Sequence, residues 1–311
     1  MYKNQRIAVV IPTHNEARHI ADVVETVPPF VDHIIVVDDH SSDETPSILK
    51  GLSDDRLSVE RLEKNQGVGG ATMAGYAKAL ANGCEIVVKM DGDGQMAPEY
   101  LPMLLDVLVE KGYDYAKGNR FLTGDLLQTM PHHRLIGNII LTFVNKLASG
   151  YWHIFDPQNG YTAIKCETLR KLNLAQIHKR YFFENDMLIA LNFHNARVCD
   201  VAIPARYRDE RSGLNPFKVS LTFPILFIPR FWHRIYQKYV LRDFSPIALF
   251  LFMGMILTAW GVIFGAYHWI LSILTEHVAT TGTVMLAVLP FILGFQLILQ
   301  AIVLDIQESP R

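Results

Sequence analysis

Two long charge-free segments near the C-terminal end place the strongest constraint on what this chain can fold into. The runs Phe244–Thr275 and Val278–Leu304 contain no Asp, Glu, Lys or Arg. About 20 apolar residues in a helix are enough to cross the hydrocarbon core of a bilayer. Each run is longer than that, so we expect two transmembrane helices. A buried helical hairpin is the alternative, but core helices of soluble proteins rarely stay free of charge for so long.

The charges around these runs predict their orientation. The connection Ile270–Thr283 carries only Glu276, whereas four cations precede the first run: Arg230, Arg234, Lys238 and Arg242. By the positive-inside rule the connection lies outside and both termini are cytoplasmic. The first residues, MYKNQRIAVVIPTHNE, lack the long apolar stretch of a signal peptide. We therefore expect an integral protein of the cell inner membrane, or an equivalent membrane, with its N-terminal domain in the cytoplasm.

The composition excludes some other functions. Half of the 311 residues are hydrophobic, and the formal net charge of −2 gives no reason to expect nucleic acid as a partner. Cys84, Cys166 and Cys199 form no CxxC or Cys/His metal pattern, which suits a reducing compartment and a role as small core residues.

Short β-branched runs alternate with helical patterns in the first part of the chain. We expect strands at Ile7–Ile11, His33–Val37, Leu57–Arg61, Ile86–Met90 and Tyr113–Lys117. Strands separated by helices predict βαβ units and a parallel sheet with its ligand crevice at the carboxyl ends of the strands. This places Pro12–Glu16, Asp38–Asp43 and Asp91–Gln95 on one rim.

The segment Phe217–Tyr239 mixes aromatic, aliphatic and basic residues just before the first apolar run. Such a mixture predicts helices that lie in the membrane interface. An ordinary core helix is the alternative, since Pro224 and Pro229 interrupt the pattern. The expected organisation is an α/β domain over 1–216, interface helices over 217–243, a two-helix anchor over 244–305 and a cytoplasmic tail over 306–311.

Paired carboxylates are the most informative chemical feature. Asp91 and Asp93 stand two residues apart at the end of an apolar strand. They repel each other unless a hard divalent cation with bound phosphates lies between them. Asp39 follows another strand on the same rim and can accept hydrogen bonds from a base or a ribose, while Ser41 and Asp43 more simply cap the next helix.

These residues belong to a set of motifs that resembles a known family. In order, the motifs are Pro12-Thr-His-Asn15-Glu16, Val36-Val-Asp-Asp39, Asn65-Gln-Gly67-Val-Gly-Gly70, Met90-Asp-Gly-Asp-Gly-Gln95 and Gly118-Asn-Arg120-Phe121. The chain is similar to inverting family-2 glycosyltransferases with the Rossmann-like α/β GT-A fold, above all the polyprenyl-phosphate sugar transferases of the dolichyl-phosphate mannose synthase type.

The resemblance implies roles for individual residues. Contacts with the nucleotide-sugar would come from Pro12, His14, Glu16, Val37, Asp39, Asp91, Gly92, Asp93 and Arg120. A divalent metal, Mg²⁺ or Mn²⁺, would be held by Asp91, Asp93 and Gln95 together with the donor diphosphate. Arg120, with Arg134 as second candidate, would stabilise charge on the leaving phosphate; a surface ion pair and a solvated position are the respective alternatives. His14 replaces an aromatic residue common in the family, so a GDP-linked or UDP-linked donor is left open.

The acceptor side is suggested by a dense set of cations before the membrane segments: Arg206, Arg208, Arg211 and Lys218, to which we add Arg134. Guanidinium groups bind phosphate oxygens in bidentate fashion, so these residues suit a lipid phosphate. A cluster that only contacts anionic headgroups is the alternative.

Glu184 and Asp186 mark the start of a helix where family members acting on hydroxyl acceptors keep a catalytic carboxylate. Asp186 would act as a base, orient the acceptor or favour the helix N-terminus. The leading hypothesis is inverting transfer of a sugar to undecaprenyl or dolichyl phosphate. Transfer to a hydroxyl of a lipid or lipid-linked saccharide, with Asp186 as base, and a non-enzymatic nucleotide-binding scaffold are the alternatives. The sugar, the lipid length and the formation of homo-oligomers are left open.

Overall fold

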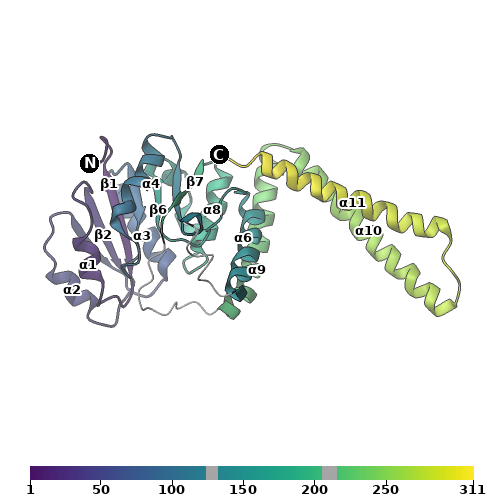
Figure 1. Cartoon of the computed structure of the whole chain (residues 1–311), viewed down its shortest axis with the longest axis horizontal. Coiled ribbons are helices and arrows are strands. Elements are labelled where there is room, and N and C mark those ends of the chain that lie inside the picture. Colours follow the sequence, from purple (N-terminus) through teal and green to yellow (C-terminus); the bar gives the residue numbers. More distant parts are fainter. Residues whose placement is uncertain (124–131, 205–215) are drawn as a thin grey trace. The chain divides into compact units, whose positions relative to one another are not determined.

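The computed structural model describes residues 1–123, 132–204 and 216–311 (Figure 1). The chain separates into two compact units, one of Met1–Arg230 with Pro310–Arg311 and the other of Phe231–Ser309.

The first unit contains a seven-stranded sheet in the order β3-β2-β1-β4-β6-β5-β7. The strands are β1 (Ile7–Thr13), β2 (His33–Asp38), β3 (Leu57–Arg61), β4 (Ile86–Lys89), β5 (Tyr115–Asn119), β6 (Thr162–Lys165) and β7 (Val198–Ala202). The helices of this unit are α1 (Ile20–Glu25), α2 (Thr45–Gly51), α3 (Val68–Ala81), η1 (Pro98–Tyr100), α4 (Leu101–Val109), η2 (Phe121–Thr123), α6 (His132–Ser149), α7 (Cys166–Lys171), η3 (Leu174–Gln176), α8 (Phe183–Phe193) and the first part of α9 (Pro216–Tyr236).

The predicted parallel arrangement is found in the first four strands but not at β6. Strands β1, β2, β3 and β4 run parallel, but β6 pairs antiparallel with both β4 and β5. The chain enters β6 from the turn at Asp156–Gly160, so β6 starts at the edge where β4 ends. This reversal brings the turn to the rim that the parallel strands form at their carboxyl ends.

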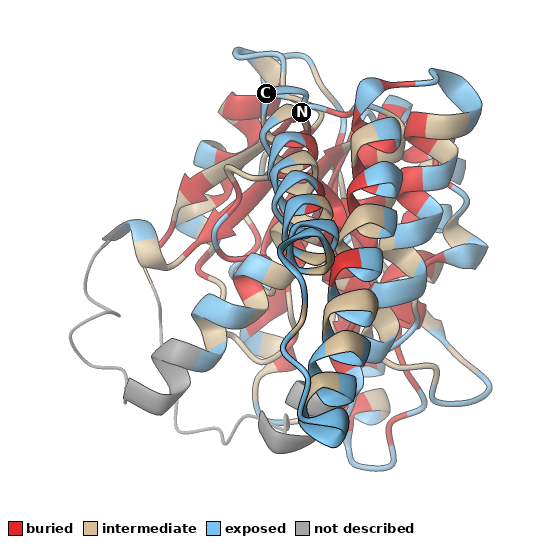
Figure 2. Ribbon diagram, turned by 90° about the vertical axis from the view of Figure 1, so that its right-hand side faces the viewer, coloured by how far each residue is buried: buried red, intermediate tan, exposed pale blue. Residues whose placement is uncertain are grey.

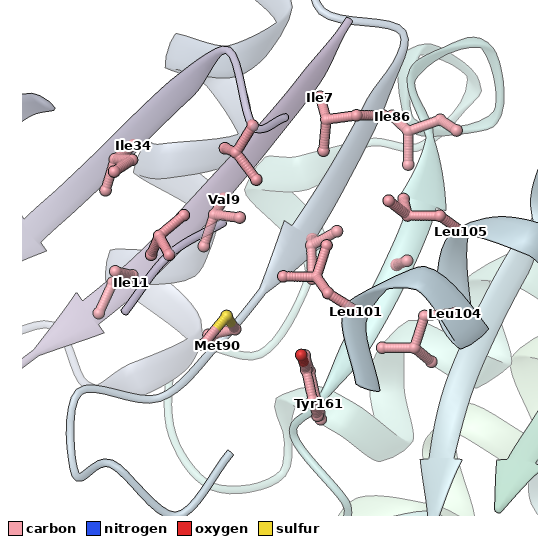
Figure 3. Packing of buried hydrophobic residues seen from close by; sticks show 14 of the residues in the cluster. Ile7, Val9, Ile11, Ile34, Ile86, Met90, Leu101, Leu104, Leu105 and Tyr161 are labelled. Atoms are coloured by element: carbon pink, nitrogen blue, oxygen red, sulfur yellow. The ribbon is translucent and has the colours of Figure 1, made fainter. Parts of the chain in front are cut away.

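Alternate residues of the central strands face two separate hydrophobic layers. Ile7, Val9 and Ile11 pack with residues of α1 and α4 in one layer (Figure 3), and Ala8 and Val10 pack with residues of α3 and α8 in the other. Burial on both faces explains why β1, β2 and β4 are nearly continuous apolar runs. Figure 2 shows the buried residues concentrated in the sheet and on the inner sides of its helices.

Helix α9 continues through Pro224 and Pro229 without a break. Its Phe223 and Phe227 are buried against Phe182, with ring centroids 5.3 and 4.8 Å away, while Ile225 and Ile228 are exposed. The described part of this helix in the first unit is therefore amphipathic, with one face packed on the rest of that unit.

The second unit contains the end of α9, the π-helical η4 (Gln237–Arg242) and two long helices, α10 (Pro246–Thr275) and α11 (Thr281–Gln307). Both long helices have the length and composition to cross a membrane. They approach closely where Gly254 of α10 faces Gly294 of α11, since a Cβ on Gly254 would lie 2.8 Å from the Gly294 carbonyl oxygen. Most of their large apolar side chains remain exposed, as expected of helices surrounded by lipid.

Candidate active site

A cavity of about 550 Å³ opens at the carboxyl ends of β1, β2 and β4. It is lined by Pro12, Thr13, His14, Glu16, Asp39, Asn65, Gly67, Val68, Ala71, Lys89, Asp91, Gly92, Asp93, Gln95, Gln158, Gly160, Arg180, Tyr181 and Glu184. Most residues that the motifs predict for the nucleotide-sugar and the metal are among them. Val37 is an exception, because it is fully buried within β2 and does not line the cavity.

The loops after β1 and β2 are fastened to each other. His14 Nδ1 lies 2.8 Å from the carbonyl oxygen of Asp39, and the Asn15 amide donates to Ser41 Oγ at 2.9 Å. Asp43 accepts from the amides of Thr45, at the start of α2, and Ala17. Ser41 and Asp43 thus join the two loops, whereas the N-cap residue of α2 is Glu44 rather than either of them.

Asp39 connects this rim to the glycine-rich loop before α3. Its buried carboxylate accepts from the amides of Gln66 at 2.6 Å and Gly67 at 2.7 Å. Gly67 has φ +86°, a left-handed conformation that favours glycine. The preceding Asp38 lies behind the cavity and accepts from the Ser41 amide. Of the two carboxylates, Asp39 is the one that lines the cavity.

Carboxylates and a buried lysine form the centre of the cavity. Lys89 Nζ lies 2.7 Å from Asp91 Oδ1 and 3.5 Å from Glu184 Oε1, and the Lys89 side chain is only 1% exposed. Burial alone would lower the pKa of Lys89, but the Asp91 and Glu184 carboxylates outweigh it and hold this pKa above its usual value. Burial raises the pKa of Glu184, an effect that Lys89 and Lys117 oppose. Asp93 lines the same cavity and accepts from the Gln95 amide at 2.9 Å.

A second buried lysine lies two strands from Lys89. Thr162 of β6 pairs with Lys89 on one side and with Lys117 on the other, which puts all three on the same face of the sheet. Lys117 donates to the carbonyl oxygen of Asn159, and burial lowers its pKa to about 8. Lys117 therefore holds the turn that presents Gln158 and Gly160 to the cavity.

Arg120 lies beside the cavity rather than among its lining residues. Its guanidinium forms a bidentate pair with the buried Asp156, Nε at 2.8 Å and Nη2 at 3.0 Å. Arg120 and Asp156 line a small adjoining pocket that shares Gln158 with the main cavity. This arrangement matches the alternative of an ion pair more closely than direct contact with a leaving phosphate.

The two acidic residues of α8 face different surroundings. Glu184 lines the cavity, whereas Asp186 does not. Asp186 Oδ2 accepts from the His178 amide at 2.8 Å and from Arg230 Nη2 at 2.9 Å. Burial raises the pKa of Asp186 and the Arg230 charge opposes that rise. Residues two apart on a helix point in nearly opposite directions, so this difference could have been recognised from the spacing.

Three of the expected lipid-phosphate ligands, Arg206, Arg208 and Arg211, lie outside the residues that the structure describes. Arg134 and Lys218 fall within α6 and α9, but their side chains are also outside that description. Sequence reasoning missed Lys89, although a lysine at the end of the apolar strand Ile86–Lys89 was a signal for a buried partner.

The comparisons with known proteins identify the family. The model of "Glycosyl transferase family 2" matches residues 8–172. The chain belongs to glycosyltransferase family 2. The family expected from the motifs is thereby confirmed, and this family 2 member is an enzyme rather than a scaffold.

Two characterised relatives are similar to this chain over more than two thirds of its length. The chain is 30% identical over 236 residues to the UDP-N-acetylglucosamine–dolichyl-phosphate N-acetylglucosaminyltransferase of Methanococcus voltae, which covers 71% of this chain and 93% of that protein. It is 36% identical over 223 residues to the polyprenol monophosphomannose synthase of Mycolicibacterium smegmatis, covering 70% and 82% respectively.

Solved structures confirm the GT-A fold of this family 2 member. Glucosyl-3-phosphoglycerate synthase from Mycobacterium tuberculosis, solved with Mn²⁺, UDP and glucosyl-3-phosphoglycerate, superposes with a TM-score of 0.55 at 22% identity, covering 74% of this chain and 80% of that one. Mannosyl-3-phosphoglycerate synthase from Rubrobacter xylanophilus gives a TM-score of 0.56 at 17% identity, covering 78% and 77%.

Proposed function

We propose that this glycosyltransferase transfers a sugar from a nucleoside diphosphate sugar to a polyprenyl phosphate, with inversion at the anomeric carbon. The observation that carries the proposal is the acid-lined cavity in a chain that also has two membrane-length helices. The relatives named as a dolichyl-phosphate N-acetylglucosaminyltransferase and a polyprenol monophosphomannose synthase support the same acceptor class.

In this reaction an ionised oxygen of the acceptor phosphate attacks the anomeric carbon, and the bond from that carbon to the donor diphosphate breaks. A phosphate oxygen is already an anion at neutral pH, so no base is needed to activate it. This agrees with the position of Asp186, whose carboxylate is bonded to His178 and Arg230 outside the cavity.

A divalent cation, Mg²⁺ or Mn²⁺, is part of the proposal. Asp91 and Asp93 both line the cavity, and their carboxylates are the hard oxygen ligands that a divalent cation prefers, although Asp91 Oδ1 also lies 2.7 Å from the Lys89 ammonium. Among the described residues no group of three His, Cys, Asp or Glu side chains is arranged to hold a metal. We therefore propose that Asp91, Asp93 and Gln95 bind the ion jointly with the donor diphosphate, where it would stabilise negative charge on the leaving group.

The remaining contacts are proposed from their positions. Pro12, His14, Glu16 and Asp39 would bind the nucleoside, because they line the part of the cavity formed by the loops after β1 and β2. Arg134, Arg206, Arg208, Arg211 and Lys218 stay a prediction for the lipid phosphate. The domain boundaries given above stay a prediction as well.

The decisive experiment incubates membranes containing the protein with polyprenyl phosphate and labelled nucleoside diphosphate sugars. Label should enter the organic phase with one donor and be released by mild acid, as expected of a glycosyl phosphate. Asp91→Asn membranes serve as the matched control. A labelled lipid that survives mild acid would show a hydroxyl acceptor and overturn the proposal.

We further propose that the catalytic unit and both termini lie in the cytoplasm, because the cations before α10 contrast with the single charge of the α10–α11 connection. A cysteine in place of His277 should react with an impermeant reagent from outside intact cells. A cysteine in place of Glu308 should react only after permeabilisation. The reverse pattern would exclude a cytoplasmic active site.

A further inference from the structure

The motif residues of the cavity do not supply enough positive charge for a bound diphosphate. A divalent ion is neutralised by the two carboxylates Asp91 and Asp93, so the negative charge of a bound diphosphate would still lack a cation. Lys89 is committed to Asp91 and Glu184. Arg120 is committed to Asp156. A phosphate that enters the cavity needs a further positive group.

Arg180 is the residue that meets this requirement. It lines the cavity and its side chain is exposed. Within the part of the chain that the structure describes, its guanidinium has no hydrogen-bond or ion-pair partner. An exposed arginine is most often simply solvated, but this one projects from a backbone segment that is fixed on several sides.

The segment around Arg180 is fastened to the glycine-rich loop before α3. The Gly70 amide donates to the Lys179 carbonyl oxygen at 2.9 Å, and Lys179 Nζ donates to Gln66 Oε1 at 2.9 Å. A Cβ on Gly67 would lie 2.9 Å from Arg180 Cγ and 2.8 Å from the Lys179 carbonyl oxygen. Gly67 is thus required for the close approach that places Arg180 at the cavity.

The same loop is fixed to the expected nucleoside site. Asp39 accepts from the Gln66 and Gly67 amides, so the nucleoside side of the cavity and the segment carrying Arg180 share one rigid connection. On the other side, the Arg180 amide donates to His178 Nδ1 at 3.1 Å, and the His178 amide donates to Asp186. This gives both the glycine-rich motif and Asp186 a positioning role.

We propose that Arg180 binds a substrate phosphate, either the donor diphosphate or the acceptor phosphate, through charge-assisted hydrogen bonds. The proposal rests on the proposed function, because it requires phosphate-bearing substrates in this cavity. Planar guanidinium groups bind two phosphate oxygens at once, which an ammonium group cannot do, so Lys at this position replaces Arg only in part.

The test measures binding and kinetics for the full chain in lipid nanodiscs. Dissociation constants are measured for UDP, UMP, GDP and GMP with Mn²⁺, and KM is measured for polyprenyl phosphate. The variants are Arg180→Ala, Arg180→Lys and, as the matched control, Arg170→Ala, which removes an exposed arginine of α7 that does not line the cavity. Thermal unfolding verifies that each variant is folded.

If Arg180 binds the donor, Arg180→Ala should weaken diphosphate binding about 10- to 100-fold while changing monophosphate binding much less. If it binds the acceptor, diphosphate binding should stay normal and KM for polyprenyl phosphate should rise by a similar factor. Arg180→Lys should recover part of either loss, and Arg170→Ala should stay within about twofold of wild type.

Two further outcomes distinguish a failure of this inference from a failure of the proposed function. If Arg180→Ala stays within about twofold of wild type in both arms while wild type is active, this inference is wrong and the proposed function stands. If wild type binds neither UDP nor GDP and transfers no sugar, the proposed function fails and this inference fails with it.

Discussion

Replacing Asp186 by Asn should reduce stability rather than catalysis. The amide oxygen of Asn can still accept from the His178 amide, but the ion pair with Arg230, 2.9 Å long, is lost. A charge-assisted hydrogen bond contributes roughly 1.5–3 kcal/mol. Because the Arg230 side chain is 35% exposed and burial already raises the pKa of Asp186, removing the carboxylate charge also removes a desolvation cost. The net loss of stability is therefore smaller than the full value of the bond. We expect a loss of about 1–2 kcal/mol.

For a domain of this size about 1 kcal/mol corresponds to a shift of about 2–4 °C in Tm, so the variant should unfold about 2–8 °C below wild type. Its turnover per folded molecule should stay within about threefold of wild type, because Asp186 does not line the cavity. Glu184→Gln is the matched variant. It is two residues away on α8, lines the cavity and lies 3.5 Å from Lys89, so turnover should fall about 10- to 100-fold with little change in Tm.

Both variants are assayed at saturating donor and several acceptor concentrations, next to thermal unfolding. A catalytic base that is removed costs about 10²–10⁴-fold in rate. If Asp186→Asn loses that much activity while its Tm equals that of wild type, the assignment of Asp186 as a structural residue is refuted and the hydroxyl-acceptor mechanism is favoured.

Three further predictions follow from other parts of the structure. Asp93→Asn should lower turnover by about 10²-fold or more, and a chelator should do the same to wild type. Added Mn²⁺ should restore the activity of wild type but not of the variant. Full activity in the presence of chelator would contradict a metal site. Burial raises the pKa of Asp200 to about 6, so its protonated form is favoured in the folded state, and stability should fall as pH rises from about 4 to 6, by roughly 2 kcal/mol in chemical unfolding curves. Asp200→Asn should flatten this dependence; an unchanged pH profile would exclude Asp200 as its source. In the second unit Arg234 and Asp305 form a buried bidentate pair with N–O distances of 2.7 and 3.1 Å. Arg234→Met should destabilise the protein in detergent by about 3–5 kcal/mol, and the double variant Arg234→Met with Asp305→Leu by much less. Equal losses in the single and double variants would show that the unpaired Asp305 charge is not the cause of the destabilisation.

The sequence predicted those parts of the structure that depend on local pattern. Apolar runs without charge predicted α10 and α11, and alternating strands and helices predicted that the loops carrying Asp39 and Asp91 share one rim. Both features depend on residues near each other in the chain. The direction of β6 could not be predicted in this way, because it depends on the path of the chain through α6 and the turn at Asp156–Gly160.

The sequence also did not predict which residues pair with the charged side chains. Arg120 and Asp156 are 36 residues apart, and Asp186 and Arg230 are 44 apart. Motif position suggested Arg120 for the leaving phosphate, and Asp186 as a base, an orienting group or a helix-end carboxylate. The ion pairs that both side chains form within the protein are revealed only by the folded arrangement of these segments.

The buried lysine of β4 suggests how the cavity stays stable before substrate enters. Asp91 and Glu184 would repel each other in a partly buried site, and Lys89 between them offsets that repulsion at the cost of its own burial. A divalent ion that approaches Asp91 alone must therefore compete with an ammonium group 2.7 Å away. A diphosphate that arrives with the ion supplies further oxygen ligands for it, which offsets this competition. For the metal site proposed above, these charges would favour a cation that binds together with its nucleotide over a cation that binds first.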